Sequence, residues 1–195
     1  MQRVVVVGGV SPLDRTLFGL AAADARTLAG RVEFEFWTNR PVAELRPAAA
    51  ALPAHTAVFF VSMQRDVAGQ TFHSVQIAQL LSASGAPVYV MFDTMLGQGP
   101  VGGAVVDFAS VGRRAGQMAA RVLEGESPGE IPIEIRTNGV PMFDWKAMRR
   151  AGVSESRLPP GSVVRFRPPT LWAEHKDYIL GGLWKRPGND SFLPA

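Results

Sequence analysis

The sequence predicts an α/β fold with an open parallel sheet of about five strands and helices on both faces. Along the first 110 residues, short apolar runs bounded by glycine alternate with longer stretches of helical apolar spacing. Hydrophobic residues make up 47% of the chain and charged residues 19%, a balance typical of a globular protein. We therefore expect strand–helix–strand units with right-handed crossovers.

The first unit shows the pattern most clearly. The run RVVVVGG at 3–9 is wholly apolar and predicts a buried parallel strand. Leucines and alanines at helical spacing follow at 11–30, where Ser11 suits the N-cap, Pro12 the first helical position and Gly30 the end. The alternating run at 32–38 predicts a strand near the sheet edge.

The same alternation continues to residue 125. A short helix interrupted by Pro47 precedes the next strand, and helical spacing returns twice. The further strands are expected at 56–62, 87–93 and 104–108, and the further helices at 72–84 and 110–125. We assign residues 1–125 to one α/β lobe and residues 126–195, rich in proline and arginine, to an irregular C-terminal arm.

The charge is unevenly placed. Residues 1–135 carry ten Lys or Arg against twelve Asp or Glu, whereas residues 136–186 carry ten against four. The arginines of the arm are spread among prolines and aromatic residues and form no basic block. We therefore interpret them as a solvated surface and expect no nucleic-acid partner.

The glycines Gly97, Gly99 and Gly102 match the pattern G-x-G-x-x-G. A dinucleotide-binding loop follows a strand directly and opens a helix, whose N-terminus holds the pyrophosphate. Here four residues separate Phe92 from the first glycine, and a strand-like run follows the last. We therefore interpret the segment as flexible backbone that crosses between structural units or approaches a ligand closely, and expect no nucleotide cofactor.

Catalytic and metal-binding patterns are also missing from the sequence. It has no cysteine, and its three histidines show no metal-ligand spacing. No serine lies in a nucleophile elbow, and the acidic pair and phospho-accepting Asp of a response-regulator receiver are not in place. We expect no enzyme activity, no cofactor and no metal, although an enzyme of similar architecture stays a minor alternative.

Polar residues gather instead where the predicted strands end. In an open α/β sheet, ligands bind outside the carboxyl ends of the strands. Carboxylates there accept hydrogens from hydroxyl or ammonium groups, and arginines bind carboxylates or ring oxygens. For each residue, helix capping or simple solvation is the competing interpretation. The candidate ligand-binding residues are Ser11, Asp14, Arg15, Ser62, Gln64, Arg65, Asp93, Thr94 and Asp107, with Asn39, Arg40 and Asp66 nearby.

Two stretches resemble a known family. The run from Pro87 to Ile133 resembles the late part of type I periplasmic binding proteins of the ABC-transporter substrate-binding branch. The run 144–182, with RLPPGS and LW, resembles the segment that joins such a domain to the first membrane helix of bacterial sensor histidine kinases. The resemblance implies the flavodoxin-like second lobe of a two-lobed binding protein plus a C-terminal arm, with most of the partner lobe and the membrane helix missing.

The resemblance implies an extracytoplasmic sensor domain of a histidine kinase, at the inner membrane, that closes on a small polar solute, a sugar or an amino acid. The alternative is the solute-binding component of an ABC importer for sugars or amino acids. The helix at 110–125 resembles one that returns to the missing lobe, and its apolar stripe would lack a cover. We therefore expect a homodimer, with contact to a membrane only through the missing flanking helix.

Overall fold

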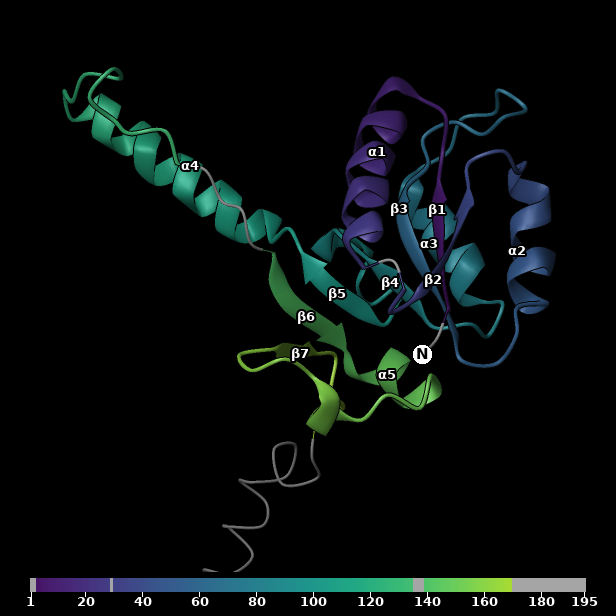
Figure 1. Ribbon diagram of the computed structural model, residues 1–195. Helices are drawn as coiled ribbons and strands as arrows, with labels where there is room; N and C mark the ends of the chain where they lie inside the picture. The colour runs from purple at the N-terminus through teal and green to yellow at the C-terminus, as the bar shows by residue number, and fades with distance from the viewer. Residues whose placement is uncertain (1–2, 29, 135–138, 170–195) are drawn as a thin grey trace, which may run out of the picture.

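A computed structural model describes residues 3–28, 30–134 and 139–169 (Figure 1). Its centre is a seven-stranded sheet in the order β2-β1-β3-β4-β5-β6-β7. All neighbouring strands are parallel except β5 and β6, which are antiparallel. The predicted α/β class is thus confirmed, with a sheet that is mostly parallel.

The first five strands and the helices between them follow the predicted order. β1 and β3 are apolar and buried, whereas β2 forms the edge. Pro47 lies inside α2 without interrupting it. The elements are β1 (Arg3–Gly8), α1 (Pro12–Thr27), β2 (Glu33–Trp37), α2 (Val42–Ala50), β3 (Thr56–Ser62), α3 (Ser74–Ser82), β4 (Val88–Val90), the 3₁₀ helix η1 (Asp93–Met95), β5 (Gly102–Val105) and α4 (Phe108–Leu123).

The sheet is larger than the five strands expected, because part of the presumed arm belongs to it. β6 (Val140–Asp144) pairs with β5, and β7 (Val163–Arg165) extends the sheet beyond β6. Between them lie α5 (Trp145–Arg150) and η2 (Glu155–Arg157). Phe143 and Met148 build a small second core against Val101. The run 144–182, whose resemblance favoured the sensor hypothesis, is described up to residue 169, and its LW motif lies outside the described residues.

The two faces of the sheet are covered to different extents. On one face, α2 and α3 lie over Val5, Phe60 and Val90, all at most 1% exposed. On the other face α1 packs against β1 and β3, while Phe59 and Tyr89 stay half-buried. The main core therefore lies between the sheet and the pair α2 and α3.

Helix α4 leaves the body of the protein. In Figure 1 it projects from the end of β5, and the chain that follows it returns along its side. No residue of α4 is buried, although its apolar residues keep to one side. Among the described residues, no helix combines the length and the hydropathy needed to cross a bilayer.

Candidate functional site

The carboxyl ends of β1 and β3 are joined through one buried carboxylate, that of Asp14 in the first turn of α1. Ser62 Oγ donates a 2.7 Å hydrogen bond to Asp14 Oδ1, and the Gln64 amide donates one of 2.9 Å to Oδ2. The amides of Ser11 and Arg65 also donate to Oδ2, at 3.1 and 3.3 Å. Asp14 is 0% exposed, so its carboxylate positions the strand ends and does not face solvent.

The charge of this carboxylate is stabilised by its donors. Burial alone would raise the pKa of Asp14, but the hydrogen bonds from Ser62, Gln64 and Ser11 outweigh burial and hold the pKa below its ordinary value. Asp14 is therefore an anion at neutral pH. It also completes a capping box, in which the backbone amide of Asp14 donates to Ser11 Oγ.

Gly9 allows the two strand ends to approach each other. Its amide donates to the Ser62 carbonyl at 2.8 Å, and the Val10 amide donates to the Arg65 carbonyl at 2.8 Å. A Cβ on Gly9 would lie 2.6 Å from that Arg65 oxygen and 2.5 Å from Asp14 Oδ2. No side chain fits there, so the first residue after β1 must be glycine.

The exposed residues of the cluster surround the buried Asp14 carboxylate. Arg15, Gln64 and Arg65 are exposed, and Ser11 Oγ donates to Gln64 Oε1 at 3.4 Å. Asp66 is buried instead, where its Oδ2 accepts from the amide of Val42 at the start of α2. The structure thus brings the predicted residues of β1 and β3 together and leaves an amide and two guanidinium groups facing solvent.

The predicted residues after β4 and β5 form a separate group. Asp93 Oδ1 accepts from the Phe108 amide at 3.4 Å, and its Oδ2 lies 3.9 Å from Arg165 Nη1 of β7. Asp107 caps α4 by accepting from the Ser110 amide at 3.1 Å, and Thr94 is exposed on η1. Both carboxylates hold the start of α4, and solute contact by this group stays a prediction.

A strand follows the glycine-rich loop, as the sequence predicts, and the loop brings strands close together; its approach to a ligand stays a prediction. Gly102 begins β5, not a helix, and a Cβ there would lie 2.3 Å from the Met142 carbonyl oxygen of β6. The Gly97 amide donates to Asp144 Oδ2 at 3.2 Å, and Asp144 also caps α5. These glycines let the neighbouring backbones meet closely.

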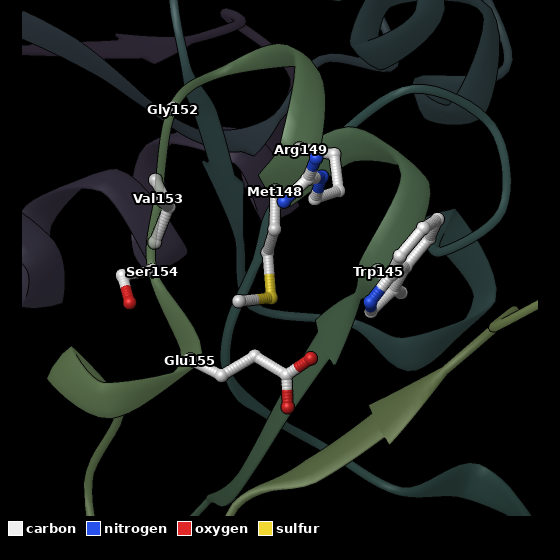
Figure 2. Close-up of a pocket in the computed structure, with 7 residues that line it drawn as sticks. All are labelled: Trp145, Met148, Arg149, Gly152, Val153, Ser154 and Glu155. Atoms are coloured by element: carbon white, nitrogen blue, oxygen red, sulfur yellow. The ribbon is translucent and has the colours of Figure 1, made fainter.

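A pocket of about 410 Å³ lies apart from this site, between α5 and η2 (Figure 2). Because β6 runs antiparallel to β5, α5 begins at the amino end of the parallel strands. The Arg149 guanidinium lies 5.7 Å from the Trp145 ring centre, and Glu155 pairs with Arg167. The charged groups at this pocket already have partners in the protein.

Sequence reasoning missed two members of the site. Ser74, at the start of α3, accepts from the Met63 amide at 3.1 Å and so holds the end of β3. Arg165 reaches Asp93 from β7. Ser74 precedes a run of helical spacing and was visible as a helix-start residue. The pairing of Arg165 depends on where β7 joins the sheet, which no local pattern reveals.

Comparison with known proteins gives the same fold. The family model of ABC transporter substrate binding proteins matches residues 33–157. A substrate-binding protein with adhesive properties from Clostridium difficile, in its ligand-free open form, has a TM-score of 0.58 at 14% identity, over 86% of this chain and 55% of that one. An ABC domain from Streptococcus pneumonia in complex with L-Trp has a TM-score of 0.56 at 17% identity, over 84% and 55%.

A conserved domain protein from Vibrio cholerae has a TM-score of 0.54 at 14% identity, over 84% of this chain and 54% of that one. The chain therefore spans about half the length of these solved structures, and the likeness to them concerns the fold. A search of curated proteins finds no match.

Proposed function

The chain belongs to the ABC transporter substrate binding protein family, and we propose that it forms one lobe of an importer's solute-binding component. The observation that carries this proposal is the cluster at the carboxyl ends of β1 and β3. There the buried Asp14 fixes the backbone, and Arg15, Gln64 and Arg65 face solvent. This edge of an open α/β sheet is where ligands bind.

The chemistry of the cluster favours a small polar solute. Guanidinium groups such as those of Arg15 and Arg65 are suited to bind carboxylates in a bidentate manner, and the side-chain amide of Gln64 can both donate and accept hydrogen bonds. An amino acid offers a carboxylate to these side chains, and a sugar offers hydroxyl groups and ring oxygens. The related domain from Streptococcus is complexed with L-Trp. We propose that a second lobe closes over the solute by hinge motion, and that the site works outside the cytoplasm.

The importer hypothesis replaces our first hypothesis, a sensor domain of a histidine kinase. The family match and the substrate-binding neighbours support a solute-binding component, and both hypotheses use the same lobe. The run that favoured the sensor, 144–182, is described up to residue 169, so that RLPPGS lies within the described residues and LW lies outside them.

Solution NMR with the intact chain tests the proposed site, because it detects the weak binding expected of a single lobe. We would titrate free amino acids and neutral sugars separately to millimolar concentrations. The expected result is that one class shifts the backbone amides of Ser11, Gln64 and Arg65. A Gln64→Ala variant should weaken binding about tenfold, since one good hydrogen bond to a charged group contributes roughly 1.5 kcal/mol.

Gln70→Ala is the matched control, because Gln70 is an exposed glutamine on the same loop and lies outside the group of residues bonded to Asp14. It should leave the affinity unchanged. Shifts that gather at α5 instead, or no shift with either class of solute, would contradict the proposal.

A further inference from the structure

Arg40, in the loop that follows β2, has a guanidinium group that forms no hydrogen bond or ion pair within the part of the chain that the structure describes. Its Nε atom is buried and has no acceptor. Nearly all buried donors in folded proteins are hydrogen-bonded, so an orphaned N–H indicates a missing partner. The side chain as a whole is half-buried, and the guanidinium therefore stays within reach of solvent.

The guanidinium is held in place by an aromatic ring instead of an acid. Its central carbon lies 4.6 Å from the ring centre of Trp37, the last residue of β2. Trp37 is 4% exposed, and its Nε1 donates a 2.7 Å hydrogen bond to Glu35 Oε1. Stacking on a fixed indole ring orients the guanidinium without using any of its N–H donors. Arg40 is thus positioned in advance for an acceptor that the described residues do not supply.

The loop that carries Arg40 is joined to the proposed solute site. β1 lies between β2 and β3 and is parallel to both, so the carboxyl ends of the three strands meet at one edge of the sheet. The Val42 amide, two residues after Arg40, donates a 3.1 Å hydrogen bond to Asp66 Oδ2. Asp66 directly follows Arg65, one of the solvent-facing residues of the site. Arg40 therefore borders the site from the β2 side.

The unpaired charges at this edge are mainly positive. Each of the three strands is followed by an arginine without an ion pair among the described residues, namely Arg15 after β1, Arg40 after β2 and Arg65 after β3. The carboxylates of Asp14 and Asp66 are buried and already accept hydrogen bonds from amides. Glu44, in the first turn of α2, is exposed and is not paired with Arg40. Cations gathered at one edge attract anions, which favours an acidic solute.

We propose that Arg40 is a further solute-binding residue and that the solute is acidic, with a carboxylate bound to the Arg40 guanidinium. This inference rests on the proposed function and narrows it from polar solutes in general to those with a net negative charge. A carboxylate fits the paired N–H groups of a guanidinium, and one bound along the Nε side supplies the acceptor that the buried N–H lacks. Because the stack on Trp37 already fixes the group, binding orders little that was free before.

Solution NMR with the intact chain tests this inference with a matched pair of probes, L-glutamate and L-glutamine. They have nearly the same size and differ in one group, a carboxylate against an amide. At equal pH and ionic strength, we expect glutamate to bind at least tenfold more tightly. Glutamate should shift the side-chain Nε–H signal of Arg40 and the indole N–H signal of Trp37, together with the amides of Gln64 and Arg65. Inorganic sulfate at the same ionic strength should leave the Arg40 signal in place.

Variants of Arg40 test its role. Arg40→Gln removes the charge and should abolish the preference for glutamate. Arg40→Lys keeps the charge but lacks the planar group that stacks and binds in a bidentate manner, so it should restore the preference only in part. Arg46→Gln is the matched control, because Arg46 is an exposed arginine further along α2, and it should keep the preference unchanged. Circular dichroism would show that all three variants fold.

The possible outcomes separate this inference from the proposed function. Equal affinity for glutamate and glutamine, with shifts at Gln64 and Arg65, would leave the proposed function in place and overturn the acidic solute. A preference for glutamate that persists in Arg40→Gln, or a shift of the Arg40 signal by sulfate equal to that by glutamate, would overturn the role of Arg40. No shift at the site with any amino acid or sugar would overturn the proposed function, and this inference with it.

Discussion

Helices α1 and α4 have the same length, 16 residues, and each follows a strand of the same sheet, yet only α1 packs on the sheet. α1 is fixed at its start by Asp14, whose buried carboxylate binds the ends of two strands. The start of α4 is held by the cap from Asp107, by the bond from its first amide to Asp93 and by the stacking of Phe108 on Phe92, all at the surface end of β5. An amphipathic pattern thus predicts that a helix will bury one side, but not which surface will cover it.

The first way to test this comparison is to remove each capping carboxylate. Asp14→Ala should lower the free energy of unfolding by about 3 kcal/mol, because several amide and hydroxyl donors would lose a charged acceptor inside the protein. Asp107→Ala should lower it by less than about 1 kcal/mol, since it removes one bond at the start of an exposed helix. Urea unfolding followed by tryptophan fluorescence measures both changes, and equal losses would contradict the distinction between the helices.

The two carboxylates show which contacts can be predicted from the sequence and which cannot. The spacing of Ser11 and Asp14 predicts the cap of α1, but the bonds from Asp14 to Ser62 and Gln64 join residues about 50 positions apart and follow only from the strand order. The antiparallel pairing of β6 escaped prediction for the same reason. Its partner β5 is a short strand rich in glycine, and prolines around 126–141 conceal the alternation that marks a strand.

The second test uses pH, because the pKa of Asp14 is lowered in the folded state. Such a group adds stability above its unfolded pKa of about 3.9, and this part is lost as the pH falls through the folded value. The difference in stability between the natural chain and Asp14→Asn should therefore be largest at neutral pH and shrink progressively below about pH 4.

Urea unfolding at several pH values between neutral and acid measures this difference. Glu126→Gln is the control, since Glu126 is a half-buried surface residue whose pKa is also lowered, by the hydrogen bond from Arg121. It should leave the profile close to that of the natural chain. A difference between the natural chain and Asp14→Asn that stays constant down to acid pH would mean that the carboxylate charge does not hold the strand ends.

The smallest expected effect comes from glycines within the two helices. Gly19 of α1 and Gly116 of α4 both have open space where a Cβ would lie. Alanine restricts the unfolded chain, so each replacement should stabilise its helix by about 0.5 to 1 kcal/mol. Circular dichroism during thermal unfolding separates the two variants at a concentration where the chain is monomeric.

Because α1 unfolds together with the sheet, Gly19→Ala should raise the midpoint of the main transition. α4 buries no residue of its own, so it gains little from the cooperative core, and a lone helix of this length is only marginally stable in water. Gly116→Ala should therefore increase the helical signal at low temperature and leave the main midpoint unchanged. If both variants raise the midpoint equally, α4 is packed in the monomer, and the proposed difference between α1, which packs on the sheet, and α4, which does not, is wrong.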